Sequence, residues 1–491
     1  MHGQVFPDYC VNQHYRARFV VSSAFTGTMG IMERGITMVV GDVTTAVDVL
    51  VLGAGPGGYV AAIRAAQLGR RVTLVDPGPP GGTCLLQGCI PLKALLSATE
   101  RYQQARQEEL SAMGIHAETV TFDWAAMQAW KQSVVDRLAE GVRRLVAGNR
   151  IEYVHGTGWF INAQEVRVEG EYGSHRFKFD RCIIATGACS APFPGLSYDG
   201  KQVLTPEQAL MLPELPAALS IAGDDYIALE SATLFARLGV EIKLFSPGAQ
   251  LLAGVDPAAL RPVQAGLRKL GVRIVTKAVI ESITERPVVI SQGACPNTSG
   301  LHLDATGLEV SANGGIVVNT MQQSSIPCIY AVGDCTGGRA LASIAIKQAK
   351  VAAEALSGQR VQFAPLVTPL VVHTTPELAS VGYSAEEATR AGYNIVTGRF
   401  PLAANGRALT LETGSGVALL VANAEDGALL GATLVGPRAG DLIGQAALAI
   451  EMGATLTDLT EILYAHPGLS ETFLEAAENA LGRAIHILAK A

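Results

Sequence analysis

The stretch Val47-Asp-Val-Leu-Val-Leu-Gly53-Ala-Gly55-Pro-Gly57-Gly58 decides the fold of the first part of this chain. It begins with an apolar run that is too short for a helix and is bounded by glycine, which is typical of a buried parallel strand. Residues 59–68 follow with helical spacing and end at Gly69, and residues 71–76 read as a second strand. The stretch therefore predicts a strand–helix–strand unit.

The turn between the first strand and the helix matches the pattern G-x-G-x-x-G. Gly53, Gly55 and Gly58 occupy its three positions, and Asp76 ends the second strand. Such glycines allow a tight turn, close approach of a pyrophosphate and close helix–strand packing, while the acid accepts hydrogen bonds from a ribose. A turn with a purely structural purpose is the alternative, and the register of strand, helix and acid argues against it.

A second unit of the same kind covers residues 219–245, but its loop is altered. It reads Gly223-Asp-Asp225-Tyr-Ile-Ala228, so only the first glycine remains. A carboxylate at Asp225 repels a phosphate by about 4 kcal/mol at ~4 Å and an effective dielectric of ~20. Ser246 stands where a ribose-binding acid is expected, and no arginine follows it. We therefore expect nicotinamide binding to be weak, altered or replaced by another acceptor, with normal binding of NAD through the backbone as the open alternative.

The remaining pattern completes an α/β fold class. Helical periodicity runs from about 98 to 147, residues 151–179 resemble antiparallel strands, and an alanine-rich helix ends near Leu356. After Leu366, strands such as 417–421 and 429–435 alternate with helices. We expect two Rossmann-like dinucleotide-binding domains followed by a C-terminal α+β domain.

Composition excludes several classes of protein. The chain has 491 residues, room for about three domains at ~150 residues each. Its net charge of −7 offers no basic face, so nucleic acid is not expected as a partner. No apolar run approaches the ~18 residues of a membrane span, so a membrane partner is not expected either. The eight cysteines are scattered, which favours a reducing cytoplasmic location.

Residues 1–45 lack periodicity and a signal-peptide core. We interpret them as an accessory N-terminal extension. A start codon assigned too early, with Met29, Met32 or Met38 as the true start, is an equally weighted alternative. An organelle-targeting segment is less favoured because arginines are few.

Cys84 and Cys89 lie five positions apart in a glycine-rich segment directly after the first unit. A thiol near a helix N-terminus has a lowered pKa, so one cysteine can remain a thiolate and exchange with a disulfide substrate. A metal site is disfavoured because no second Cys or His pair lies nearby, and a structural disulfide is disfavoured because its loop is short. The pair predicts a redox-active disulfide.

The segment Gly81-Gly-Thr-Cys84-Leu-Leu-Gln-Gly-Cys89-Ile-Pro-Leu-Lys93 closely resembles that of the FAD-dependent pyridine nucleotide–disulfide oxidoreductases, and within them the dihydrolipoamide dehydrogenases. The resemblance extends from about Thr45 to the C-terminus. It implies that Cys84 meets the substrate and that Cys89 faces the flavin. It also implies that Lys93 lies near the flavin and pairs with Glu230.

The same resemblance assigns cofactors and domains. It implies FAD contacts at Gly53, Gly55, Gly58, Asp76, Thr83, Lys93, Gly156, Thr186, Gly187, Asp334 and Ala342. The resemblance implies NAD contacts at Gly223, Glu230 and Gly293, although Ala294 replaces the arginine of the family's Gly-Arg-x-Pro-Asn segment. The implied boundaries are 46–196 and 319–362 for the FAD-binding domain, 197–318 for the NAD(P)-type domain and 363–491 for the dimerisation domain.

A candidate acid–base pair lies near the C-terminus, in His466-Pro-Gly-Leu-Ser-Glu471. Imidazole exchanges protons near neutral pH, and Glu471 can hold its tautomer. Without other evidence, a histidine before proline is more often a packing or surface residue. The segment resembles the family's His-Pro-x-Leu-Ser-Glu, which reaches the partner subunit's disulfide and implies a homodimer.

These observations favour an enzyme that oxidises dihydrolipoyl groups carried on a protein, using the Cys84–Cys89 disulfide, FAD and NAD⁺. The alternative function is a flavin-loaded protein that binds lipoyl proteins or senses redox state with little nicotinamide turnover. The altered second loop favours that alternative. The retained Cys84, Cys89, His466 and Glu471 argue against it.

Overall fold

The computed structural model describes residues 44–106, 113–171, 173–193 and 195–488. The N-terminal extension expected over residues 1–45 lies outside these ranges except for its last two residues, Thr44 and Thr45, which belong to the first strand. Within the described ranges, no helix is both long and apolar enough to cross a membrane.

The first sheet forms around the apolar run at residues 47–52. β1 (Thr44–Leu52) pairs in parallel with β2 (Val72–Asp76) and β6 (Gly173–Ile184), and α1 (Pro56–Gln67) connects β1 to β2. The expected strand–helix–strand unit is therefore confirmed. The order is β3-β2-β1-β6-β5-β4, with β14 (Ile329–Ala331) paired to β6. The last four residues of β1 are almost fully buried, as a central strand covered on both faces requires.

The expectation of antiparallel strands over residues 151–179 is partly wrong. β4 (Thr157–Asn162), β5 (Glu165–Gly170) and β6 are antiparallel neighbours. In contrast, β3 (Glu152–His155) pairs in parallel with β2 and extends the nucleotide-type sheet at its edge. The helix before it, α5 (Trp124–Gly148), provides the crossover that a parallel pairing needs.

The second unit is a separate parallel sheet of order β11-β10-β9-β12-β8. β9 (Ala218–Ala222), α7 (Tyr226–Arg237) and β10 (Glu241–Phe245) form the second predicted strand–helix–strand unit. Its other elements are β8 (Val203–Leu204), α6 (Pro206–Ala209), α8 (Pro257–Lys269), β11 (Arg273–Val275), η1 (Ile280–Ser282) and β12 (Val288–Ile290).

Two short antiparallel strands carry the chain between the sheets. β7 (Ala188–Ser190) leaves the first sheet after β6, and β13 (Ala294–Pro296) returns after β12. The chain then passes through η2 (Leu303–Ala305) to β14, followed by η3 (Gly333–Thr336) and α9 (Ala342–Leu356), which packs on α1. The helix expected to end near Leu356 is thus confirmed.

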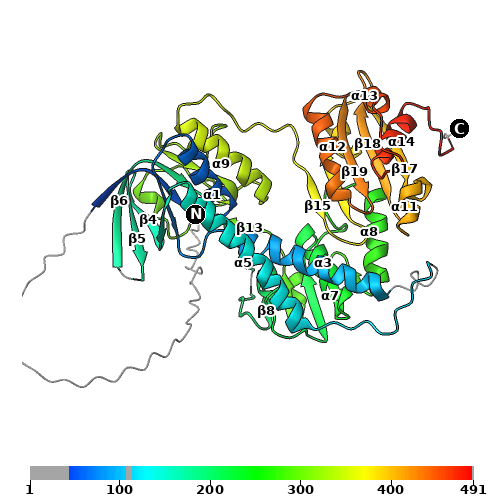
Figure 1. The fold of residues 1–491 in the computed structure, drawn as a ribbon, viewed down its shortest axis with the longest axis horizontal. Helices are drawn as coiled ribbons and strands as arrows, with labels where there is room; N and C mark the ends of the chain where they lie inside the picture. The colour runs from blue at the N-terminus through cyan, green and yellow to red at the C-terminus, as the bar shows by residue number, and fades with distance from the viewer. Residues whose placement is uncertain (1–43, 107–112, 172, 194, 489–491) are drawn as a thin grey trace, which may run out of the picture.

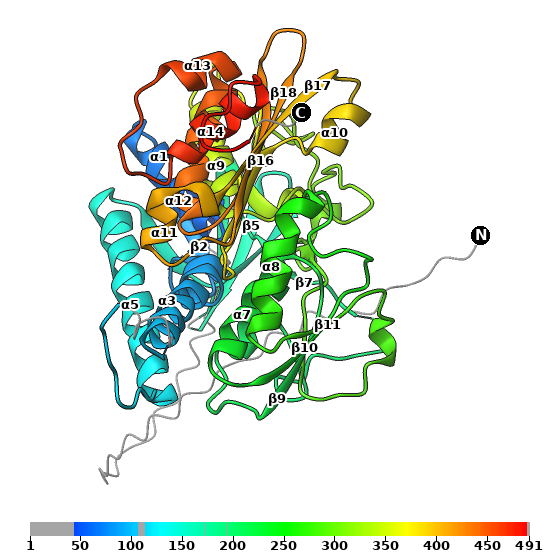
Figure 2. The same cartoon turned by 90° about the vertical axis from the view of Figure 1, so that its right-hand side faces the viewer.

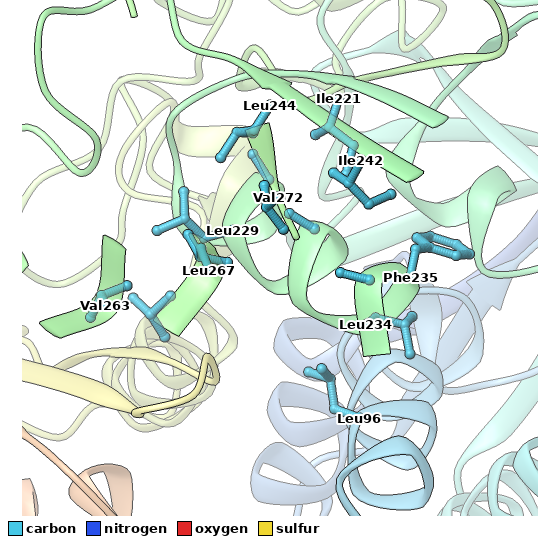
Figure 3. Packing of buried hydrophobic residues seen from close by; sticks show 14 of the residues in the cluster. Leu96, Ile221, Leu229, Leu234, Phe235, Ile242, Leu244, Val263, Leu267 and Val272 are labelled. Carbon is cyan, nitrogen blue, oxygen red and sulfur yellow. The ribbon is translucent and has the colours of Figure 1, made fainter. Parts of the chain in front are cut away.

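Among the described residues of the helical stretch expected over 98–147, the structure has two helices, α3 (Cys89–Arg106) and α5. α3 follows the short α2 (Gly82–Leu86) and packs against both α5 and α7. Figure 3 shows Leu96 of α3 beside Leu234 of α7, within one buried cluster. Burial of such a leucine contributes about 1.5–3 kcal/mol. This packing fixes the helix that begins at Cys89 against the second unit.

The C-terminal part contains an antiparallel sheet of order β15-β16-β19-β18-β17. Figures 1 and 2 both place α8 of the second unit beside it. Its strands are β15 (Leu370–Val372), β16 (Leu378–Gly382), β17 (Ile395–Pro401), β18 (Val417–Asn423) and β19 (Leu429–Val435). Its helices are α10 (Ala385–Arg390), η4 (Leu402–Ala404), α11 (Gly406–Thr410), α12 (Ala439–Glu451), α13 (Leu456–Glu461) and α14 (Glu471–Ala480).

Candidate active site

A cavity of about 1860 Å³ lies where the first loop, the cysteine segment and the second unit meet. The carboxyl ends of parallel strands are the usual ligand site of such sheets. Apart from Gly58, Gly223, His466 and Glu471, every site residue predicted from the sequence lines this cavity: Gly53, Gly55, Asp76, Thr83, Cys84, Cys89, Lys93, Gly156, Thr186, Gly187, Glu230, Gly293, Asp334 and Ala342.

At its glycines the first loop presents backbone to the cavity. Gly53 has a φ of +98°, and a Cβ there lies 2.3 Å from the carbonyl oxygen of Ala185. A Cβ on Gly58 lies 1.7 Å from the carbonyl oxygen of Gly53, so α1 approaches β1 too closely for a side chain. Gly55 caps α1 without a side-chain hydrogen bond, and Pro56 begins the helix. The helix N-terminus is therefore open to a phosphate.

Asp76 holds this loop as well as facing the cavity. Its Oδ2 accepts a hydrogen bond from Ala54 N at 2.6 Å, and its Oδ1 accepts one from Gly78 N at 2.7 Å. Burial raises the pKa of Asp76, although both hydrogen bonds oppose that shift. A carboxylate has about four acceptor positions, so two remain for ribose hydroxyls. The acid, the glycines and the open helix terminus together fit the adenosine diphosphate half of FAD.

The residues expected around the rest of FAD come from other elements. Ala342 begins α9, whose N-terminus has no side-chain cap. Asp334 lies in η3, where burial raises its pKa. Thr186 Oγ1 donates to the carbonyl oxygen of Asn297 at 2.7 Å, which ties the start of β7 to the end of β13.

The two cysteines are brought together by a turn between α2 and α3. Cys84 lies within α2, and Cys89 is the first residue of α3. A hydrogen bond from Cys84 lowers the pKa of Cys89 to about 7, with burial opposing the shift and Lys93 supporting it. The same hydrogen bond, together with burial, raises the pKa of Cys84. In the reduced pair Cys89 is therefore the more acidic thiol, and Cys84 keeps its proton.

Lys93 lies one turn after Cys89 on the same face of α3. Its Nζ is 2.5 Å from Oε2 of Glu230, which is fully buried in α7. Oε1 of Glu230 accepts a hydrogen bond from His373 N at 2.9 Å, so the buried carboxylate is fixed from the C-terminal sheet as well. The Lys93–Glu230 pair expected from the family is present, and it joins the two nucleotide-type units beside the thiols.

The second loop caps its own helix. Asp225 precedes α7, and its Oδ1 accepts a hydrogen bond from Ala228 N at 2.8 Å. Ser291 Oγ lies 2.8 Å from each carboxylate oxygen of Asp225. Burial raises the pKa of Asp225, and both hydrogen bonds oppose that shift. The carboxylate thus occupies the position at which a helix N-terminus binds phosphate.

His466 and Glu471 form the expected pair, outside the cavity of their own chain. His466 Nδ1 is 2.9 Å from Oε1 of Glu471, and Gly468 N donates to Oε2 at 2.7 Å. Partial burial raises the pKa of Glu471, but the hydrogen bonds from Gly468 and His466 outweigh it and leave the pKa below its ordinary value. The His466 side chain is 81 % exposed, and neither residue is among those that line the cavity. Within one chain the pair does not meet the thiols.

Two features were missed by the sequence analysis. Tyr226 is the first residue of α7 and lines the cavity near the thiols, and burial raises its pKa. Cys189 and Cys295 place their sulfurs 3.2 Å apart across β7 and β13. Each cysteine stands two residues after a cavity glycine, Gly187 or Gly293. Their separation of 106 residues hid the pair from an analysis of local spacing.

Comparisons with known proteins point to one family. The family model described as pyridine nucleotide-disulphide oxidoreductase matches residues 47–349, and its dimerisation domain matches residues 368–477. The dihydrolipoyl dehydrogenases of Geobacillus stearothermophilus and Bacillus subtilis are each 41 % identical, over 92 % of this chain and all of theirs.

Solved structures give the same result. LpdA from Mycobacterium tuberculosis superimposes with a TM-score of 0.82 at 25 % identity, covering 88 % of this chain and 99 % of that one. The HOCl-induced flavoprotein disulfide reductase RclA from Escherichia coli gives a TM-score of 0.79 at the same identity and coverage. The named relatives are oxidoreductases, which does not favour the binding-protein alternative. The chain belongs to the pyridine nucleotide-disulphide oxidoreductase family, with FAD and NAD(P) as its implied cofactors.

Proposed function

We propose that this protein oxidises dihydrolipoyl groups carried on a partner protein and passes their electrons through a Cys84–Cys89 disulfide and FAD to NAD⁺. The observation that carries the proposal is the paired thiols, which lie in one cavity with an open dinucleotide loop. The lowered pKa of Cys89 and the raised pKa of Cys84 make Cys89 the better leaving group of the two. The residues assigned to FAD and catalysis keep the roles predicted from the sequence.

The thiol chemistry follows from the pKa values. His466 of the partner subunit removes the proton from one substrate thiol, and the resulting thiolate attacks Cys84 Sγ. The Cys84–Cys89 bond breaks, and Cys89 leaves as a thiolate, which its pKa of about 7 favours at neutral pH. The second substrate thiol then attacks the mixed disulfide. Lipoyl disulfide is released, Cys84 regains a proton, and two electrons have moved to the enzyme.

Gly53, Gly55, Asp76, Ala342 and Asp334 would hold FAD in the cavity. When bound there, FAD supplies the two-electron acceptor that reoxidises the dithiol and reduces NAD⁺. Lys93, held by the buried Glu230, would position its ammonium beside the flavin and the Cys89 thiolate.

A homodimer supplies the missing base in this proposal. His466 is exposed and absent from the cavity of its own chain, while Glu471 holds its Nδ1. With Nδ1 held, Nε2 is left to exchange a proton with a dithiol of the neighbouring subunit.

The proposal is tested by measuring NAD⁺ reduction by dihydrolipoamide in the holoenzyme. Cys84→Ser and Cys89→Ser are each expected to lower kcat by about 10³-fold or more, because no disulfide can form. Cys328→Ser is the matched control, since Cys328 is half-buried and does not line the cavity. Loss of flavin reduction by dihydrolipoamide is the expected cause. Unchanged turnover in either serine variant would contradict the proposal.

Mixing subunits that carry different substitutions tests whether each active site combines Cys84 of one subunit with His466 of the other. Dimers of Cys84→Ser alone and of His466→Ala alone should both be nearly inactive. A mixed dimer contains one site with both substitutions and one site with neither, so it should recover about half of the wild-type activity per dimer. Absence of recovery in mixed dimers that carry FAD would contradict the assignment of His466 to the partner's site.

A further inference from the structure

A second pair of cysteines lies outside the thiol chemistry described above. Cys189 in β7 is directly opposite Cys295 in β13, and their sulfurs are 3.2 Å apart. Each sulfur also lies near the other residue's carbonyl oxygen, at 3.8 Å and 3.6 Å. Both side chains are half-buried thiols in the structure.

The backbone already has the geometry that a disulfide requires. Directly opposed residues of an antiparallel ladder have Cα atoms about 4.5–5.5 Å apart, and disulfides span Cα separations of about 4.4–6.8 Å. The sulfurs need to approach by only roughly 1 Å to bond. The ladder is held at its far end by hydrogen bonds, because Asn297 N donates to Gly187 and Asn297 Nδ2 donates to Thr186.

The position of this pair gives a bond there a specific effect. β7 carries the chain out of the first sheet and β13 carries it back, so every residue of the second unit lies between the two cysteines. A bond between them closes the second unit into one covalent loop. Cross-linking a loop of this length restricts the unfolded chain and stabilises the folded form.

We propose that Cys189 and Cys295 are a second redox couple, which peroxide oxidises to a disulfide that stabilises the second nucleotide-type unit. The couple is separate from Cys84 and Cys89, and the proposal does not depend on the lipoyl substrate. Cys189 lines the cavity and Cys295 does not, so Cys189 is the residue that meets peroxide first.

The chemistry is balanced with hydrogen peroxide as the oxidant. The Cys189 thiolate attacks one peroxide oxygen, the O–O bond breaks, and a sulfenic acid and hydroxide form. The Cys295 sulfur then attacks the sulfenic sulfur, so that an S–S bond forms and the S–O bond breaks. Two thiols lose two electrons and two protons, and peroxide becomes two water molecules. A small dithiol reverses the reaction by exchange.

Peptide mapping by mass spectrometry tests the bond directly in the FAD-loaded protein. After treatment with hydrogen peroxide and blocking of remaining thiols, a peptide linking Cys189 to Cys295 is expected, and it should disappear after reduction with dithiothreitol. Detection of an oxidised Cys84–Cys89 peptide in the same sample shows that oxidant reached the protein. If that peptide forms while Cys189 and Cys295 are recovered as blocked thiols, the proposal is wrong.

Pulse proteolysis in urea tests the stabilising effect. The urea concentration at which residues of the second unit are cleaved is expected to rise by roughly 1 M or more in peroxide-treated wild type. Cys189→Ser and Cys295→Ser should each abolish that rise, whereas Cys328→Ser should retain it. A linked peptide without any rise in wild type would overturn the stabilising role, and this reading does not depend on how the variants fold.

Discussion

The two dinucleotide-type loops of this chain have the same strand–loop–helix topology. They differ in the side chains at the start of the helix that follows. In both, the first glycine is enforced by a neighbouring strand, because a Cβ on Gly53 or Gly223 lies 2.3 Å or 2.2 Å from a carbonyl oxygen. At the second position Gly55 leaves the start of α1 open, while Asp225 caps the start of α7 with its own carboxylate. The same topology therefore gives either an open anion site or a helix that caps itself.

The two units also carry the acidic residue beside the loop at different positions. In the first unit Asp76 ends the second strand and accepts from the loop at Ala54 N. In the second unit Ser246 directly follows the strand, and its Oγ donates to Asp224 in the loop at 3.2 Å. Asp224 also accepts from Gly248 N at 3.3 Å. A negative charge thus remains beside the position of a ribose although the strand-end acid is absent.

The largest effect is expected at the third position of the G-x-G-x-x-G pattern, where the two loops differ. Gly58→Ala places a methyl 1.7 Å from the Gly53 carbonyl oxygen, whereas the second unit already accommodates Ala228 in a fully buried position. We expect Gly58→Ala to destabilise the first unit by about 1–3 kcal/mol and to lower FAD occupancy severely. Flavin absorbance after purification and urea unfolding measure both quantities.

The matched change is Ala228→Gly, which should cost only about 1 kcal/mol because it removes one methyl from a helix. Equal effects of Gly58→Ala and Ala228→Gly on FAD occupancy would show that the two loops do not differ as described.

The next largest effect concerns the self-capped helix. Asp225→Asn keeps a capping side chain and removes the charge, so we expect the KM for NAD⁺ to fall by about tenfold or more while stability stays within ~1 kcal/mol of wild type. Asp225→Gly should give a similar KM and a small further loss of stability. An unchanged KM in both variants would mean that the carboxylate does not oppose the phosphates.

A smaller effect is expected at Asp224. A carboxylate at the ribose position repels a 2′-phosphate, and Ser246 offers no positive charge to bind one. Asp224→Asn is therefore expected to lower the preference for NAD⁺ over NADP⁺ by about tenfold, measured as the ratio of the two kcat/KM values. Asp256→Asn, which changes the N-cap of α8 in the same unit, is the control and should leave the ratio unchanged.

The smallest effect is a pH dependence of nicotinamide binding. Burial raises the pKa of Asp225 above its usual value of about 3.9, so its neutral form is favoured in the folded protein and that contribution is lost as pH rises through the raised pKa. The Kd of the oxidised enzyme for NAD⁺ should therefore fall as the pH is lowered toward the raised pKa of Asp225. Isothermal titration measures it, and Asp225→Asn should show no such trend.

Local sequence alone predicted most of the site. The run before Gly53, the register of Asp76 and the spacing of Cys84 and Cys89 gave the first unit, the thiol pair and the cofactor class, because each depends on residues that are close in the chain. The His466–Glu471 pair also follows from local spacing. The predicted domain boundaries stay predictions.

Tertiary structure decided what depends on residues far apart in the chain. Only the fold shows that Ser291 holds Asp225, that Asp224 takes the place of a strand-end acid, and that β3 joins the first sheet in parallel. Only the fold brings Cys189 next to Cys295. The two cysteines are 106 residues apart in the sequence, and they meet because β7 and β13 pair as antiparallel strands. Backbone conformation and short motifs are encoded by neighbouring residues, whereas charge neutralisation and sulfur pairing are set by which strands become neighbours in the folded chain.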